Sequence, residues 1–243
     1  MKRCIMGILF ACLCLGSIAW GENNCLTPTK AEGILREFMP ADFKILSVKP
    51  VKDIPGLCEV AIKATHKPPF IIYMDTRGKY LFSGNLFRLK DKKNLTSENA
   101  VSYWQLTKEE MKVLDKCVSF TYGQGKQSVF YITSPDCPYC ATGMPVVKKW
   151  AKGKGVKLKV VLLPISSKAS EKAIAIFCDK KGFSGLETNY ISKNQCQAGK
   201  DKVANTLKSL QEIGIRGAPT LVSESGQVKI GNLSEEELDQ LVN

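Results

Sequence analysis

In the first hundred residues, apolar and polar positions alternate along short stretches, the period expected of strands with one buried face. A run with helical spacing precedes them at 34–38, and Thr29 with Glu32 has the spacing of a capping box at its start. This pattern predicts one helix followed by three or four strands, with a hairpin turn at 76–78 between the last two. The strands are expected over 43–51, 57–64, 69–75 and 80–87.

The middle of the chain changes character twice. Residues 91–99 are polar and unpatterned, which indicates a hinge, and a helix from about Thr107 to Lys116 follows. Beyond it lie a β-branched and aromatic run at 128–132, typical of a strand, and a helical run at 144–150. The second half therefore begins with a strand and a helix, as in α/β domains.

The remaining pattern continues in the same way. A buried strand is expected over 157–163, ended by Pro164, and a helical insertion over about 168–213. The last elements are a strand after Pro219, a turn at Ser225-Gly226, a final strand, and a closing helix with Ser234 and Glu237 as its capping box.

Cys137-Pro138-Tyr139-Cys140 lies between the strand at 128–132 and the helix that follows, and it carries the strongest chemical signal. Two cysteines separated by two residues at such a junction can close a small disulfide, and a helix amino terminus stabilises the first sulfur as thiolate. The pair therefore predicts redox chemistry. Half of a zinc site is the alternative, but the chain has one histidine, His66, and no second CxxC pair.

A second signal lies about eighty residues downstream, where Gly217-Ala218-Pro219-Thr220 opens an apolar strand. Proline has no N–H and is tolerated at a strand start, and the sequence leaves its isomer open. Coupled to the CxxC pair, this proline resembles the cis-proline of the thioredoxin fold, whose loop faces the catalytic cysteines. Pro145, inside the expected helix, resembles the kinking proline of that fold.

Together these features resemble the DsbC/DsbG group of thiol:disulfide interchange proteins, over nearly all of the mature chain. The resemblance is carried by residues 134–140, by a helical insertion that holds Cys178 and Cys196, and by residues 217–219. The Cys-Pro-Tyr-Cys sequence is more similar to the DsbG branch, because the DsbC branch more often has glycine after the first cysteine. Ala218 departs from the group, which usually has threonine before the cis-proline.

The resemblance implies an α/β thioredoxin fold with a helical insertion, preceded by a small α+β dimerisation domain and a linker helix. It also implies a structural disulfide between Cys178 and Cys196, and a V-shaped homodimer around an apolar client-binding cleft. A first domain of about eighty residues has a marginal core, which favours pairing through a sheet edge. The expected division is a signal peptide over 1–21, the dimerisation domain over 22–100, the linker helix over 101–117 and the catalytic domain over 118–243.

The amino terminus predicts export. Lys2 and Arg3 precede an apolar run at 5–20, and Ala19-Trp20-Gly21 has small residues at the positions that a signal peptidase reads. We expect cleavage after Gly21 and a periplasmic location. An uncleaved anchor and lipidation at Cys12 are the alternatives, but the run is short for a membrane span and its sequence fits a lipobox poorly.

Three of the ten cysteines lie in the predicted signal peptide, which leaves seven. Four of these form the CxxC pair and the implied Cys178–Cys196 disulfide. The remaining three are Cys25, Cys58 and Cys117. Cys58 and Cys117 lie on apolar faces and have a plain interpretation as small buried residues. A Cys25–Cys58 disulfide is the alternative for the first domain, by analogy with small exported domains.

The formal net charge is +12, and removal of Lys2 and Arg3 with the signal leaves +10. Lysines at 148, 149, 152, 154, 157 and 159 supply much of it. We interpret this face as a solvated surface, with acidic clients and anionic membranes as the alternatives. No nucleic-acid motif is present, so nucleic-acid binding is disfavoured.

The resemblance gives each site residue an expected role. Cys137, exposed at the helix start, is the nucleophile that attacks a client disulfide, and the N–H groups of Tyr139 and Cys140 support its thiolate. Asp136 opposes that charge, so a moderate oxidant is expected. Cys140 lies deeper and resolves the mixed disulfide.

The other expected roles concern the client and the proton. Pro138 stiffens the loop and Tyr139 supplies an apolar wall. Ala218 and Pro219 hold an extended client segment beside the nucleophile. Tyr131 occupies the position of the buried acid of thioredoxin, so that proton route is absent.

The sequence therefore predicts an exported, dimeric protein disulfide isomerase or thiol reductase without a cofactor. Its expected partners are unfolded or misoxidised client proteins and a membrane thiol reductant of the DsbD type. A net dithiol oxidase and a chaperone-like holdase are the alternatives.

Overall fold

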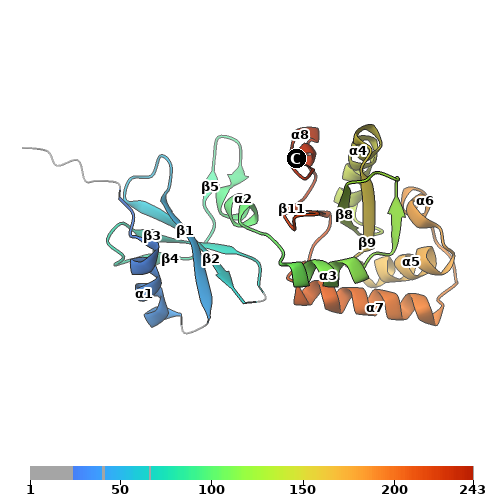
Figure 1. Ribbon diagram of the computed structural model, residues 1–243, viewed down its shortest axis with the longest axis horizontal. Coiled ribbons are helices and arrows are strands. Elements are labelled where there is room, and N and C mark those ends of the chain that lie inside the picture. Colours follow the sequence, from blue (N-terminus) through green and yellow to red (C-terminus); the bar gives the residue numbers. More distant parts are fainter. Residues whose placement is uncertain (1–23, 40–41, 66, 243) are drawn as a thin grey trace, which may run out of the picture.

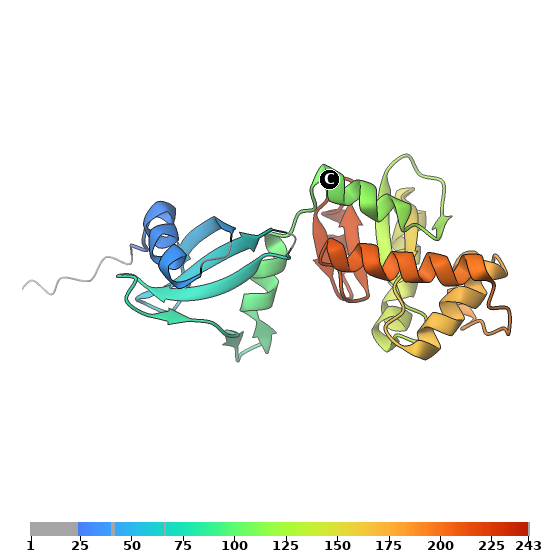
Figure 2. The same cartoon turned by 90° about the horizontal axis from the view of Figure 1, so that it is seen from below.

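The computed structural model describes residues 24–39, 42–65 and 67–242, so the predicted signal peptide and His66 lie outside the described residues. Two lobes lie side by side along the long axis, and each is built on its own sheet (Figures 1 and 2). The first sheet has the strand order β1-β2-β3-β4 and the second has the order β11-β10-β8-β9-β7. A small α+β lobe followed by an α/β lobe is the fold class that the sequence predicts.

The first helix, α1 (Pro28–Phe38), begins earlier than the sequence predicts. Its N-cap is Thr27, whose side chain accepts a hydrogen bond from the Lys30 N–H, and the predicted capping box of Thr29 and Glu32 is wrong. The physical reason is Pro28, because a proline at the first helical position has the required φ and loses no hydrogen bond. Glu32 pairs with Arg36 one turn along instead.

The first sheet follows the prediction for three strands. β1 (Phe43–Pro50), β2 (Leu57–Ala64) and β3 (Phe70–Asp75) pair antiparallel, and their apolar face packs on Ala31 and Leu35 of α1. A disulfide joins Cys25 to Cys58, with an S–S distance of 2.07 Å. The amino-terminal segment is thereby tied to the middle of the sheet.

The fourth predicted strand is broken. β4 (Leu81–Phe82) pairs with β3, whereas β5 (Phe87–Arg88) pairs with β6 (Lys93–Asn94) in a separate two-stranded ribbon. Residues 83–86 separate the two pieces and include Gly84, and glycine inside a strand weakens it. The predicted strand over 80–87 is therefore two short strands in two sheets.

The predicted hinge at 91–99 is wrong over most of its length, because α2 (Leu95–Ser102) begins there. Asn94 caps this helix by accepting from the Ser97 N–H, and the Thr96 hydroxyl bonds the buried Tyr73 hydroxyl at 2.7 Å. Thr96 is the buried residue of the helix. Polar contacts hold α2, so it lacks the apolar period that reveals a helix in a sequence.

Helix α3 (Lys108–Lys116) is the helix expected from about Thr107, and Thr107 with Glu110 forms a full capping box. Leu114 of this helix and its C-cap residue Cys117 pack in one core with Phe130 of the second sheet. The helix expected to be a linker thus packs as part of the second lobe. The residues before it cross between lobes, and the Trp104 carbonyl there accepts from the Val228 N–H at 3.0 Å.

The second sheet has apolar cores on both faces. β8 (Ser128–Thr133) is buried along its length and pairs parallel with β9 (Lys157–Leu162). Val129 and Tyr131 face one core, whereas Phe130 and Ile132 face the other. The strands β10 (Thr220–Ser223) and β11 (Val228–Ile230) complete one side of the sheet. The edge strand β7 (Phe120–Tyr122) lies on the other side, and it is too short to show a strand period in the sequence.

Helices cover both faces of this sheet (Figure 1). Helix α4 (Pro138–Lys154) runs from the end of β8, and α8 (Glu235–Asp239) has the predicted capping box of Ser234 and Glu237. The helical insertion consists of α5 (Ser167–Cys178), α6 (Gly182–Glu187) and α7 (Gln197–Glu212). A disulfide joins Cys178, the last residue of α5, to Cys196, the N-cap of α7.

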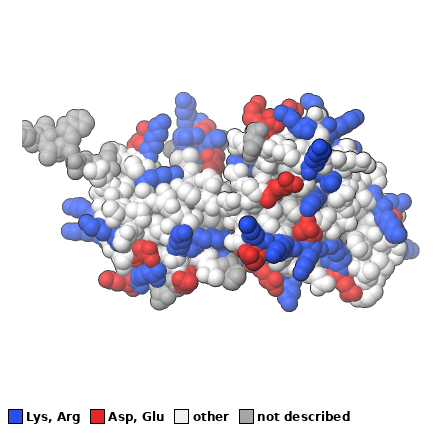
Figure 3. All heavy atoms as spheres, viewed as in Figure 1, with Lys and Arg blue, Asp and Glu red and all other residues white. Residues whose placement is uncertain are grey.

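The lysines at 148–159 lie largely in ion pairs. Lys148 pairs with Glu187, and three more pairs join Lys149 to Glu235, Lys154 to Asp239 and Lys159 to Asp115. On the face shown in Figure 3, basic and acidic side chains are interspersed over both lobes. Exposed pairs of this kind contribute little stability, so the arrangement fits a solvated surface.

Within the described residues, we find no helix with the length and apolar character required to cross a membrane.

Candidate active site

The site begins where β8 ends. The chain leaves the sheet after Thr133, and Asp136 has a positive φ of 73° that turns it into the start of α4. Cys137 is the N-cap of α4 and Pro138 occupies the first helical turn. Proline at that position is already shaped for a helix, so the sequence places Cys137 at the positive end of the helix dipole.

The Cys137 sulfur has two close backbone neighbours. The Cys140 N–H donates to Cys137 Sγ at 3.3 Å, and Cys137 Sγ lies 3.7 Å from the Ala218 carbonyl oxygen. The Ala218–Pro219 peptide bond is cis. One of the two N–H contacts expected at the sulfur is therefore present, from Cys140.

Cys137 is 4% exposed, so the expectation of an exposed nucleophile is wrong. The Ala218 carbonyl beside its sulfur explains part of this burial. Tyr139, the third residue of the motif, is 72% exposed.

Cys140, in the first turn of α4, is as buried as Cys137 and has a weakly acidic thiol. Burial, followed by its hydrogen bond to Cys137, raises the pKa of Cys140 to about 12. A thiol with this pKa stays protonated at neutral pH. The two cysteines are free thiols in the structure, so this is the reduced pair.

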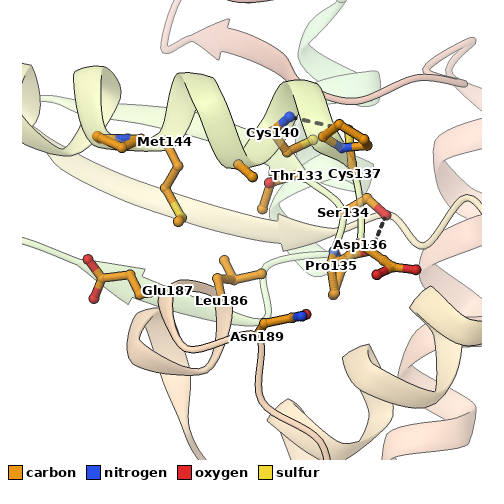
Figure 4. Close-up of a pocket in the computed structure, with 13 residues that line it drawn as sticks. Thr133, Ser134, Pro135, Asp136, Cys137, Cys140, Met144, Leu186, Glu187 and Asn189 are labelled. Atoms are coloured by element: carbon orange, nitrogen blue, oxygen red, sulfur yellow. Dashed lines mark hydrogen bonds between the residues drawn. The ribbon is translucent and has the colours of Figure 1, made fainter.

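A cavity of about 610 Å³ opens beside the two cysteines. Figure 4 shows Cys140 and Met144 of α4 on one side, and Leu186, Glu187 and Asn189 at the end of α6 on the other. Asp136 and Pro135 close the end next to Cys137. The cavity thus lies between the helix of the cysteine pair and the helical insertion.

Asp136 is bound from the insertion by Lys172 of α5. Lys172 Nζ donates to Asp136 Oδ1 and to Asn189 Oδ1, both at 2.7 Å, and Lys168 Nζ lies 3.7 Å from Asp136 Oδ2. The hydrogen bond from Lys172 is the largest cause of a lowered pKa at Asp136.

Sequence reasoning missed Lys172, although its position among Ala169, Ala173 and Ile176 on the buried face of a helix is an available signal.

Tyr131 lies under the cysteine pair, at the position where thioredoxin has a buried acid. It is fully buried, and its hydroxyl has no hydrogen-bond partner among the described residues. Burial raises the pKa of Tyr131 well above its ordinary value. The hydroxyl therefore stays neutral beside the thiols.

The structure brings most of the predicted site residues together. Cys137, Pro138 and Cys140 line the cavity, Tyr139 extends outward, and Ala218 lies against the Cys137 sulfur without lining the cavity. The Cys178–Cys196 disulfide lies apart from the site and joins α5 to α7.

A mixed sheet with a helix that starts at a cysteine pair, opposite a cis-proline, defines the thioredoxin fold. Residues 120–243 match the family model described as a thioredoxin-like domain, about half of the sequence, and the chain belongs to this family. Residues 24–97 match the disulfide bond isomerase protein N-terminal domain. The resemblance to the DsbC/DsbG group that the sequence predicts is confirmed by these two domains.

Comparison with individual proteins gives distant relatives. The chain is 27% identical to the thiol:disulfide interchange protein DsbG of Pseudomonas aeruginosa over 147 residues, which is 58% of this chain and 54% of that protein. It therefore spans about half the length of this curated relative.

Two solved structures are also similar. Helicobacter pylori DsbG is 16% identical, with 79% of this chain and 98% of that chain covered and a TM-score of 0.38. The compact conformation of Proteus mirabilis ScsC is 17% identical, with 60% and 83% covered and a TM-score of 0.48.

Proposed function

We propose that this protein is an exported thiol:disulfide interchange enzyme that isomerises or reduces non-native disulfides, or oxidised thiols, in client proteins. The observation that carries the proposal is the geometry at Cys137. Cys137 is the N-cap residue of a 17-residue helix. Its sulfur accepts a hydrogen bond from the Cys140 N–H at 3.3 Å and lies beside the Ala218 carbonyl. A helix amino terminus and a donated N–H both favour a thiolate, which is the attacking species in disulfide exchange.

The chemistry takes place in two steps. The Cys137 thiolate attacks one sulfur of a client disulfide, so that the client S–S bond breaks, a Cys137–client bond forms, and the other client sulfur leaves as a thiolate. In isomerisation, another client thiolate attacks the mixed disulfide and releases Cys137 unchanged. In reduction, Cys140 loses its proton and attacks the Cys137 sulfur, which frees the client thiol and oxidises the pair.

Regeneration follows from this balance. After a reductive turnover the Cys137–Cys140 disulfide must receive two electrons and two protons. We propose that a membrane thiol reductant of the DsbD type supplies these electrons. No further cofactor is required.

The client is held beside the pair by neighbouring residues. Backbone groups of Ala218 and Pro219 are proposed to bind an extended client segment, since the Ala218 carbonyl is already next to the sulfur. Pro138 and Tyr139 are proposed to supply the adjoining surface. The exposure of the Tyr139 ring supports a contact with a partner rather than with the core.

We propose that the first lobe is a dimerisation domain and that two copies form the active protein. The sheet order leaves β1 and β4 as edge strands, and unpaired edges favour association. Exposed aromatic and leucine side chains lie near β4 and β5, which also supports an interaction surface. They are Tyr80, Phe82, Phe87 and Leu89.

The proposed location is the periplasm, after removal of residues 1–21. The disulfides Cys25–Cys58 and Cys178–Cys196 support an oxidising compartment, because cytosolic thiols are kept reduced. In the mature chain we propose a dimerisation domain over 22–100, a linker helix over 101–117 and a catalytic domain over 118–243.

Reactivation of scrambled, fully oxidised ribonuclease in mild glutathione buffer tests the activity. We expect the mature protein to restore ribonuclease activity and the Cys137→Ala variant to restore none above buffer. If the mature protein has no effect, isomerisation is excluded.

The alternatives are then distinguished by two further assays. A net oxidase converts reduced ribonuclease to its disulfide form. A holdase suppresses aggregation of an unfolded client even when Cys137→Ala and Cys140→Ala are combined.

A further inference from the structure

The Lys172 ammonium, near the cysteine pair, is one of the most buried charged groups among the described residues. The Lys172 side chain is 4% exposed, although lysine is almost never fully buried without a partner. Its Nζ donates to Asp136 Oδ1 and Asn189 Oδ1, both at 2.7 Å. A buried cation has therefore been given two acceptors on the wall of the cavity beside the cysteine pair.

Asp136 links this cation to the cysteine pair. It directly precedes Cys137, and its φ of 73° lies in the left-handed region, which costs energy for residues other than glycine and is tolerated best by Asn and Asp. A free carboxylate next to Cys137 also opposes negative charge on the sulfur. A cation that binds the Asp136 carboxylate holds the residue in its left-handed conformation and also offsets its negative charge.

The insertion holds Lys172 firmly in position. The Cys178–Cys196 disulfide joins the end of α5 to the start of α7. At Gly199 of α7 the two helices are so close that a Cβ atom would lie 2.6 Å from Cys178 Sγ. The disulfide and the close packing on α7 thus fix the position of α5, which carries Lys172.

We propose that Lys172 is a positioning residue for the thiol chemistry of Cys137: its buried ammonium fixes the left-handed turn at Asp136 and neutralises that carboxylate, so that the neighbouring sulfur can carry a negative charge. This inference rests on the proposed function, because it concerns the same thiolate. It assigns the helical insertion a direct part in setting the reactivity of the cysteine pair.

The other charged groups near Asp136 allow a matched comparison. Lys168, on the same helix, lies 3.7 Å from Asp136 Oδ2, but its side chain is 68% exposed. Glu187, across the cavity, is paired with Lys148. Water screens the exposed lysine, so most of the effect on Asp136 is expected from Lys172.

The test is the pH dependence of Cys137 alkylation by iodoacetamide. The full mature protein is mildly reduced so that Cys178–Cys196 stays closed, and modification of the Cys137 peptide is read by mass spectrometry. Since the thiolate is the reacting species, the rate at pH 6 reports its population. We expect Lys172→Met to lower this rate about threefold or more, because the carboxylate of the residue next to Cys137 then keeps only the exposed Lys168 as a partner. We expect the matched Lys168→Met to change it much less.

Two further variants show whether the lysine acts through Asp136. Asp136→Asn keeps a residue that tolerates a positive φ and removes the charge, so the rate at pH 6 should rise. In the Asp136→Asn background, Lys172→Met should have little further effect. An unchanged alkylation profile in folded Lys172→Met, or an equal loss in both backgrounds, overturns the proposal.

A lower melting temperature with an unchanged alkylation profile means that Lys172 is structural only, which also overturns it. If Lys172→Met does not fold, Lys172→Gln removes the charge and retains a hydrogen-bond donor. If that variant fails as well, Asp136→Asn decides, and an unchanged rate there contradicts the inference.

These measurements need no client protein. They therefore remain informative if ribonuclease reactivation fails, and the reactivation result stands whatever the alkylation profiles show.

Discussion

At the residue scale, the cysteine pair combines two sulfurs with unlike surroundings. Cys137 Sγ receives a backbone N–H at the start of α4, whereas Cys140 lies within the helix, near a neutral and fully buried Tyr131. The Tyr131 hydroxyl has no described hydrogen-bond partner. These unlike surroundings support the proposed division into an attacking Cys137 and a resolving Cys140.

The raised pKa of Cys140 predicts a pH-dependent stability of the reduced protein. The folded thiol has a pKa of about 12, above the ordinary value of 9.0, so the folded state retains a proton that the unfolded state has already lost. Its contribution is complete below pH 9 and is lost as the pH rises toward 12, by at most about 1.4 kcal/mol per pH unit.

Urea unfolding of the reduced protein at pH 8 and pH 10 measures this loss. Tyrosines and lysines titrate in the same range, so Cys140→Ala serves as the reference. We expect the reduced protein to lose more stability than Cys140→Ala between the two pH values. Equal losses would mean that Cys140 is not protected from ionisation.

At the element scale, two predictions concern the start of α1 and the packing of α5 on α7. The start of α1 depends on Thr27 and Pro28, and the close packing of α5 on α7 depends on Gly199. Neither feature contacts the cysteine pair, and the stability of the protein measures each of them.

Thr27→Ala should destabilise the protein by about 1 kcal/mol, because the Lys30 N–H at the start of α1 loses its acceptor. The matched change Thr29→Ala, in the exposed first turn, should have almost no effect. Chemical unfolding of both variants measures the difference. A larger loss for Thr29→Ala would restore the capping box that the sequence pattern predicts.

Gly199→Ala should destabilise the helical insertion by about 1–3 kcal/mol, because its Cβ would lie 2.6 Å from Cys178 Sγ and 3.0 Å from the Ile174 side chain. Gly153→Ala in α4 is the control, since no atom lies within 4 Å of its new Cβ. There alanine should stabilise the protein by about 0.5–1 kcal/mol through its higher helix propensity. Thermal unfolding of the two variants should give shifts of opposite sign.

At the scale of the whole molecule, two lobes with separate sheets are joined through α2, α3 and the crossing segment between them. The second lobe has a core on each face of its sheet, whereas the first lobe has a smaller core under α1 and a disulfide between Cys25 and Cys58. Exposed apolar side chains near β4 leave this first lobe suited to a second copy.

The proposed dimer gives a prediction at this scale. Phe82→Glu places a charge on the β4 edge, where Phe82 is 55% exposed, and should shift the protein from dimer to monomer. Ile191→Glu, at a 70% exposed position in the second lobe, should leave the dimer intact. Light scattering coupled to gel filtration measures the mass of each variant. A monomeric parent protein, or a dimer that resists Phe82→Glu, would contradict assembly through this edge.

Local patterns in the sequence are enough to predict the two-lobe plan, three strands of the first sheet, and the strand and helix on either side of the cysteine pair. These features follow from short-range causes, namely alternation, capping residues and proline at a helix start, which a sequence displays directly. The pairing of a cysteine motif with a distant proline also led to the family, because each motif is a local signal.

The remaining features depend on contacts between distant residues and become visible in the folded molecule. Helix α2 rests on a hydrogen bond to Tyr73 and has no apolar period, and β7 is recognisable because β9 pairs with it. The burial of Cys137 and the binding of Asp136 by Lys172 join segments that are far apart in the chain. Burial and ion pairing are properties of the folded surroundings, so no local pattern specifies them.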